Sequence, residues 1–190
     1  MRSLLALALM LATATAARAG ILLEGRLNGT ALRIELGPDP TRVVVTVAGE
    51  RRLLALAAAP PRPAPGYRLA RWSTGPLVAG YGTSYHVLTL DASICGEVLA
   101  AGWMTPFLAP AVQAIGALEA DDARLAPVAR PVCGAIPFAT FAANGFPLMA
   151  GWKDAAVFET TRLQFDHPSP PELVPPADVS EASPAPSPAP

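Results

Sequence analysis

Few residues of this chain have the types and spacing that chemistry requires. The stretch Gly82–His86 partly matches the turn that presents a nucleophilic serine in hydrolases. It lacks the second glycine, however, and it lies in a strand pattern rather than at a strand-to-helix turn. Cys95 and His86 are a conceivable pair of nucleophile and base. A disulfide at Cys95 would exclude that pair, and His86 is more simply explained as a polar residue in a strand.

Metal-binding and phosphate-binding patterns are equally weak. The two histidines and two cysteines are not at zinc-site spacings, and no C-x-x-C redox motif occurs. The Gly-rich segment Gly75–Gly82 lacks the lysine of a phosphate-binding loop and opens no helix. We interpret Asp121 and Asp122 as a solvated pair at a helix end. The sequence therefore predicts a protein that is not an enzyme and that uses no cofactor and no metal.

Cys95 and Cys133 are the only cysteines. An even number of cysteines in an exported chain suggests one disulfide, which would stabilise the fold by about 4 kcal/mol on the chain-entropy model. The alternative is two buried free thiols.

The N-terminus has the order of a secretory signal peptide. A positive start at Arg2 leads into the unbroken apolar run Leu4–Leu11, and small residues follow up to Ala17–Ala19. A membrane anchor would need about 20 apolar residues, which this run does not reach. We expect residues 1–19 to be a signal peptide cleaved after Ala19, and no later segment is apolar for long enough to form a stable transmembrane anchor.

Composition narrows the partners and the compartment. The formal net charge is −1, and it becomes more negative when Arg2 and Arg18 leave with the signal peptide, so nucleic acid is not an expected partner. Lys153 is the only lysine, and Ala and Pro are abundant. We associate this usage with a high-GC bacterium, which makes the periplasm of a Gram-negative cell the expected location.

The C-terminal residues have the composition of a disordered tail. From His167 onward they are mostly Pro, Ser, Ala and acids, which bury too little apolar surface to offset the entropy of ordering. We expect one folded domain over residues 20–166 and a disordered Pro-rich tail over residues 167–190, whose removal should hardly change stability. The tail is either a plain solvated terminus or a ligand for a Pro-binding module.

Hydrophobic periodicity predicts an α+β domain with an antiparallel sheet covered on one face by one or two helices. A β-meander is expected first, with a turn at Asn28-Gly29. After a Pro-rich loop, extended segments precede a helix over 106–120, with Thr105 as its cap, and a closing hairpin follows. The expected strands lie at about 21–27, 32–36, 43–47, 52–56, 77–90, 94–103, 146–150 and 155–165, and a second short helix lies at 138–143.

The helix over 106–120 is apolar nearly all round. Such a helix is buried on all sides or borders an apolar ligand. Tryptophans near turns and strand ends either rim the same groove or pack at edges. The groove candidates are Phe107, Val112, Ile115, Trp103 and Trp152.

The order of elements resembles a known family. Amphipathic hairpins lead to Tyr81–Val87 and then to Ile94–Val98, an apolar helix follows, and the chain closes through Gly145–Leu148 and Phe158–Leu163. This layout resembles bacterial periplasmic domains of unknown function with a fold like that of LolA, the carrier of outer-membrane lipoproteins. The resemblance covers residues 20–166 and implies a curved, half-barrel antiparallel sheet that wraps around helices and can hold acyl chains. It places no ligand residue of that family on this chain.

Two functions follow from these observations. The first is an exported protein that binds or carries an apolar ligand, such as a lipid or an acylated protein. The second is an envelope module for protein–protein interaction, which acts through a sheet edge or the Pro-rich tail and needs no small-molecule ligand. A pocket lined by large apolar residues favours the first function, and a filled core with an exposed apolar edge favours the second.

Overall fold

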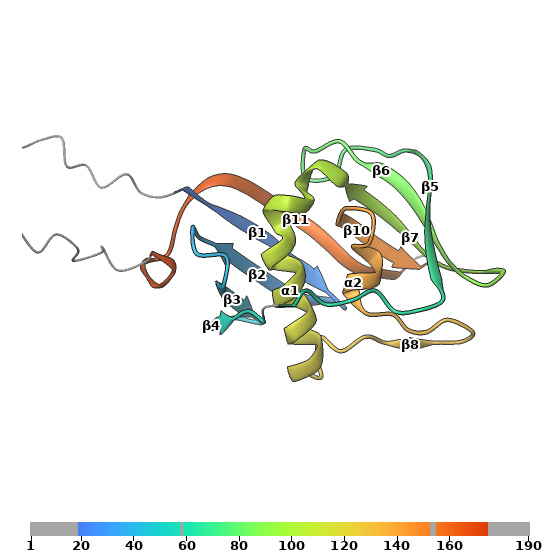
Figure 1. The fold of residues 1–190 in the computed structure, drawn as a ribbon, viewed down its shortest axis with the longest axis horizontal. Helices are drawn as coiled ribbons and strands as arrows, with labels where there is room; N and C mark the ends of the chain where they lie inside the picture. Colours follow the sequence, from blue (N-terminus) through green and yellow to red (C-terminus); the bar gives the residue numbers. More distant parts are fainter. Residues whose placement is uncertain (1–18, 58, 153–154, 175–190) are drawn as a thin grey trace, which may run out of the picture.

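A computed structural model describes residues 19–57, 59–152 and 155–174. The predicted signal peptide up to residue 18 lies outside these ranges, and so do Lys153 and the tail beyond Val174. Within them the chain forms one open, twisted nine-stranded antiparallel sheet (Figure 1). The predicted α+β class with an antiparallel sheet is confirmed.

The sheet has the strand order β4-β3-β2-β1-β11-β10-β7-β6-β5, so β4 and β5 are its two edges. Its strands are β1 (Ala19–Leu27), β2 (Thr30–Leu36), β3 (Arg42–Val47), β4 (Glu50–Ala55), β5 (Tyr67–Thr74), β6 (Ser84–Leu90), β7 (Ser93–Ala101), β10 (Phe146–Trp152) and β11 (Ala155–Pro168). A separate small ribbon contains β8 (Ala129–Arg130) and β9 (Gly134–Ala135).

The expected opening meander is confirmed in β1 to β4. Alternating residues place one apolar row of each strand on the same face, which we call the inner face, and the register Leu23–Ile34–Val45 runs across three of the strands. At the turn between β1 and β2, Asn28 and Gly29 both have positive φ, as the Asn-Gly pair predicts for a tight hairpin. Asn28 also donates hydrogen bonds to two backbone carbonyls far along the chain, those of Leu125 and Ala126, both at 3.0 Å.

Strand β11 joins the two halves of the sheet. It pairs with β1 on one side and with β10 on the other, so the last strand of the chain lies beside the first. The pairing of β1 with β11 runs from Ala19 opposite Pro168 to Leu27 opposite Phe158, with two irregularities in register. The halves that precede and follow the Pro-rich loop therefore form one sheet only after the chain is complete.

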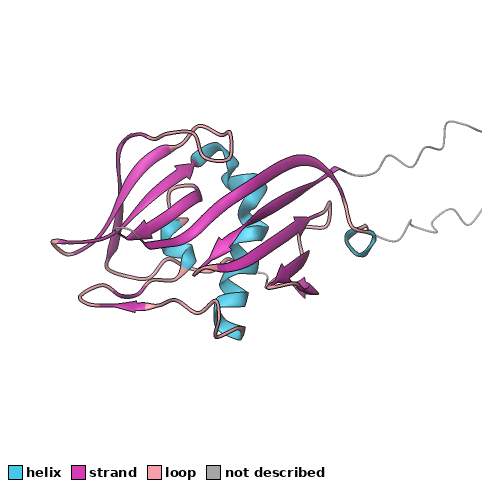
Figure 2. Cartoon of the chain, turned by 180° about the vertical axis from the view of Figure 1, so that it is seen from behind, coloured by secondary structure: helices cyan, strands magenta, loops and turns pink. Residues whose placement is uncertain are grey.

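The helices α1 (Thr105–Asp121) and α2 (Phe138–Phe141) lie on the inner face, and the other face is free of them (Figures 1 and 2). A 3-10 turn, η1 (Gly102–Met104), leads into α1. The expected cap at Thr105 is wrong: the N-cap is Met104, and the Thr105 hydroxyl donates to the carbonyl of Gly102 at 2.8 Å. The hydroxyl therefore ties α1 to the preceding turn.

The core lies between α1 and the inner face. One side of α1 is fully buried, and its residues pack with the apolar rows of the meander and with Phe138, Phe146 and Phe158. The buried residues of α1 are Leu108, Ala111, Ala114, Ile115 and Leu118.

The ordered structure continues past Asp166, where we expected the folded domain to end. Strand β11 runs to Pro168, and a 3-10 turn, η2 (Pro171–Leu173), follows and contacts β3. Leu173 has no exposed surface, and Glu172 forms an ion pair with Arg51 of β4. Residues 167–174 thus belong to the folded part of the chain.

Candidate functional site

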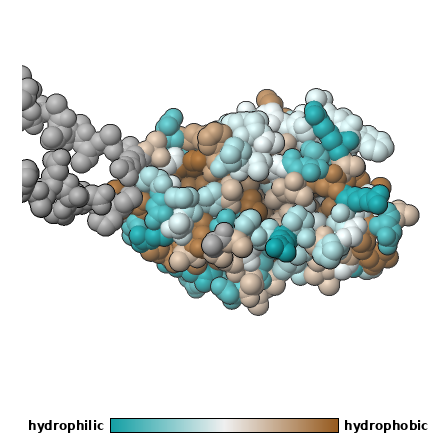
Figure 3. All heavy atoms as spheres, viewed as in Figure 1, coloured by the Kyte–Doolittle hydropathy of each residue, from teal (hydrophilic) through white to brown (hydrophobic). Residues whose placement is uncertain are grey.

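The outer side of α1 is the most unusual surface of the molecule. No charged residue occurs between Val98 and Leu118, yet much of this segment faces solvent. A solvent-facing helix surface normally carries polar residues. Figure 3 shows apolar residues reaching the surface on this face of the molecule. Two apolar regions flank α1, one on each side.

The first region is a groove between α1, α2 and the Pro-rich loop that connects β4 to β5. It has a volume of about 250 Å³, and Thr105 is the only polar residue among the described residues that line it. The loop is held across the helices at Ala64, whose N–H donates to the hydroxyl of Thr140 at 2.9 Å. We call this region the strap groove; its residues are Pro60, Pro61, Pro63, Thr105, Ala109, Val112, Ala139, Ala142 and Ala143.

The second region is an aromatic cluster at the beginning of α1, formed by Tyr81, Trp103, Phe107 and Phe165. The rings of Trp103 and Phe165 are stacked with centroids 6.0 Å apart, and Tyr81 and Phe107 pack against Phe165 at 6.1 and 6.2 Å. Trp103 is 55% exposed and Phe107 is 53% exposed. Aromatic rings that could bury their surface in the core instead form a platform in contact with solvent.

The five predicted groove residues do not line one cavity. Ile115 is fully buried in the core, whereas Phe107 belongs to the aromatic cluster and Val112 to the strap groove. Phe107 and Val112 point about 140° apart around the helix axis, because each residue of an α-helix turns by about 100°. Trp103 joins the aromatic cluster, and Trp152 ends β10 at the hairpin to β11. The hydrophobic periodicity predicted the helix, but it did not predict the direction in which each side chain points.

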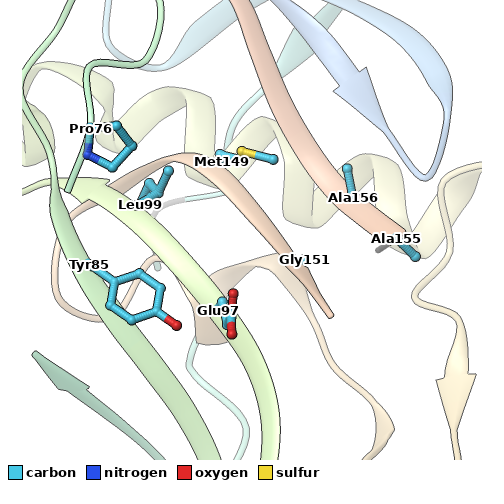
Figure 4. Close-up of a pocket in the computed structure, with 8 residues that line it drawn as sticks. All are labelled: Pro76, Tyr85, Glu97, Leu99, Met149, Gly151, Ala155 and Ala156. Atoms are coloured by element: carbon cyan, nitrogen blue, oxygen red, sulfur yellow. The ribbon is translucent and has the colours of Figure 1, made fainter. Parts of the chain in front are cut away.

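A third concave region lies on the opposite face of the sheet (Figure 4). It has a volume of about 390 Å³, and we call it the outer groove. Tyr85 of β6 and Glu97 of β7 are its ionisable residues. The pKa of Tyr85 is raised by burial and, second, by Glu97. The remaining lining residues are Pro76, Leu99, Met149, Gly151, Ala155 and Ala156.

The structure joins Cys95 and Cys133 in a disulfide with a Cα–Cα distance of 5.6 Å. It ties β7 to the β8–β9 ribbon, where the Tyr67 hydroxyl also donates to the carbonyl of Cys133. Because the Cys95 sulfur is bonded, it is not a nucleophile for His86. The imidazole of His86 is buried on the inner face, where burial and then the charge of Arg71 lower its pKa.

The acidic pair at the end of α1 was expected to be solvated, but the side chain of Asp122 is only 10% exposed and has a structural role. Asp122 is the C-cap, and the Arg124 side chain hydrogen-bonds to its carboxylate at 2.8 Å. This bond, with help from a backbone hydrogen bond and from Arg52, lowers the pKa of Asp122 to about 2. The arginines offset the unfavourable position of an acid at a helix C-terminus.

Glu119 has a strongly raised pKa. It lies near the end of α1 and is mostly buried, and burial raises its pKa to about 7. Its partner is the N–H of Phe138 at the beginning of α2, which holds the pKa below the value that burial alone would give. Sequence reasoning missed this residue because one glutamate on an apolar helix carries no motif.

Within the described residues, no group of three or more His, Cys, Asp or Glu side chains is placed to hold a metal ion. No helix in these ranges is long and apolar enough to cross a membrane. The disulfide indicates an extracytoplasmic location, because such bonds persist in oxidising compartments. No family model, curated protein or solved structure matches the chain.

Proposed function

We propose that the protein is an exported, periplasmic binding protein that holds an apolar ligand along α1. The ligand class is the acyl chain of a lipid or of an acylated protein, as the resemblance to lipoprotein carriers implies. In this proposal the signal peptide is cleaved after Ala19. The observation that carries the proposal is the charge-free segment between Val98 and Leu118, in which Trp103 and Phe107 are more than half exposed on one side of α1 and an apolar groove lies on the other.

The strap groove suits an acyl chain better than it suits a polar metabolite. Its wall offers apolar contact and one hydroxyl, so a ligand with several polar groups would lose hydrogen bonds to water without replacement. Each methylene transferred from water into such a site contributes about 0.8 kcal/mol. The small side chains of Ala109, Ala139 and Ala142 leave room for a chain one methylene wide.

Binding of a fluorescent fatty acid tests this proposal. Ala109→Trp fills the groove from an exposed position, so we expect it to weaken binding at least tenfold. Ala120→Trp places the same ring on an exposed position of the same helix outside the groove, and it should bind as the wild type does. If the wild type binds no acyl probe, and the protein purified from the periplasm carries no lipid in native mass spectra, the proposal is wrong.

An interaction module is the second candidate, because β5 is an edge strand with Trp72 76% exposed. An edge strand offers unpaired backbone groups to a strand of a partner. A photo-crosslinking residue introduced in living cells at position 72 or at position 109 separates the two functions. Protein adducts formed only from position 72 favour the module, whereas lipid adducts from position 109 favour the carrier.

A further inference from the structure

We propose that the outer groove is a second binding site, which takes organic ammonium ions with an apolar body. The site is on the face of the sheet opposite α1, so it is separate from the surface proposed to hold acyl chains (Figures 2 and 4). Its volume of about 390 Å³ falls in the range of small-molecule pockets.

The groove combines one negative charge with an apolar wall. Glu97 and Leu99 alternate with the buried Val98 along β7, which places both on the outer face. Across the sheet, Leu99 lies between Tyr85 and Met149 in register, so an apolar floor extends beside the carboxylate. A ligand that fits this arrangement has a cationic head beside Glu97 and an aliphatic body over Leu99 and Met149.

The charges around the groove favour a cation. None of its eight lining residues is Lys, Arg or His. Among residues 19–57, 59–152 and 155–174, no cationic side chain is within ion-pair distance of Glu97. Glu159 of β11 lies opposite Met149 of β10 in register and adds a second carboxylate at the rim of the groove. On the other side of β11, Arg26 of β1 lies opposite Glu159.

Tyr85 adds an aromatic surface beside the carboxylate. It is the diagonal neighbour of Glu97 across β6 and β7, because Val87 lies directly opposite Glu97 and Tyr85 lies opposite Leu99. The ring face attracts cations, and quaternary and primary ammonium groups both exploit this property. An anionic ligand is repelled by Glu97, which sets this site apart from one for fatty acids.

Three probes of matched length test the proposal: hexylammonium, hexanol and hexanoate. Binding is followed from the amide NMR shifts of Glu97, Leu99 and Gly151. We expect hexylammonium to bind at least fivefold more tightly than hexanol, because one ion pair in water-like surroundings changes the affinity by about this factor. Hexanoate should not bind. Added salt should reduce the preference. Equal binding of hexylammonium and hexanol would overturn the proposal.

Variants locate the site. Glu97→Gln should lose the preference for hexylammonium while binding hexanol as before, whereas Asp91→Asn, an equal charge change in the β6–β7 turn, should keep it. Ala109→Trp should also keep the preference for hexylammonium, so the outcome for the outer groove does not depend on the outcome of the acyl-chain proposal.

Lys153→Gln removes the chain's only lysine. If hexylammonium binds to Lys153→Gln but not to the wild type, the chain supplies its own cation and the proposal is wrong.

Discussion

Both carboxylate oxygens of Glu119 lie 3.0 Å from the backbone nitrogen of Phe138. A residue near the end of α1 thus accepts a hydrogen bond from the first residue of α2, whose own N-cap is Pro137 and offers no side-chain acceptor. The carboxylate joins the two helices that wall the strap groove. This link is also pH-sensitive, because burial raises the pKa of Glu119 from 4.5 to about 7.

Stability should therefore fall as the pH rises from about 4.5 to about 7, since the folded state binds the Glu119 proton more tightly than the unfolded state does across this window. Glu119→Gln keeps an oxygen that accepts from Phe138 and removes the titration. We expect this variant to be more stable than the wild type above pH 7 by about 1–2 kcal/mol, after allowance for the exposed part of the carboxylate. Urea unfolding at several pH values measures the difference. Glu159→Gln, an exposed control, should follow the wild type, and an equal pH slope in Glu119→Gln would contradict the assignment.

The contact of Leu173 with Gly37 predicts that η2 stabilises the sheet. A Cβ at Gly37 would lie 2.5 Å from the Cβ of Leu173, so the side chain packs directly on the backbone. We expect Leu173→Ala to cost about 2–4 kcal/mol and to lower the melting temperature clearly. Val174→Ala, at the partly exposed neighbour, should change stability by less than about 0.5 kcal/mol. Equal melting temperatures for the two variants would show that η2 does not dock.

Ile115 and Phe107 should respond differently to truncation. Ile115 is fully buried, so Ile115→Ala should cost about 2–5 kcal/mol through lost transfer energy and a cavity. Phe107 is 53% exposed, and Phe107→Ala should cost less than half as much. Because Phe107 lies outside the strap groove, this variant should weaken the binding of acyl probes less than Ala109→Trp does. Denaturant unfolding and probe titration on the same samples compare both effects. A large loss of stability in Phe107→Ala without a change in binding would assign the aromatic cluster to the core.

Reduction of the disulfide should destabilise the fold without abolishing it. Loss of the cross-link between Cys95 and Cys133 should cost about 4 kcal/mol on the chain-entropy model. We expect neither cysteine to react with a thiol label before reduction, and the far-ultraviolet circular dichroism to persist after it. Rapid labelling of the native, unreduced protein would mean that the thiols are free in solution.

The sequence by itself determined the local elements with strong periodicity. The alternation in residues 21–56 predicted the meander, and the change of period after Thr105 predicted α1, because both patterns follow from backbone geometry over a few residues. Strand β5 was missed because most of its side chains are exposed, so it carries no apolar row. The ordering of residues 167–174 was missed for a similar reason: one leucine among prolines gains its burial only from a distant strand.

The positions of the aromatic cluster and of the outer groove were decided only by the tertiary structure. Tyr81 and Tyr85 both fall in the strand expected at 77–90. Tyr81 instead lies in an isolated bridge with Val78, outside β6, and reaches Phe165, whereas Tyr85 borders the outer groove. The aromatic cluster joins residues as distant as Tyr81 and Phe165, which meet because β11 inserts between β1 and β10. Such pairings depend on which strand edges remain free after the rest of the chain has folded, and no local pattern of residues records that.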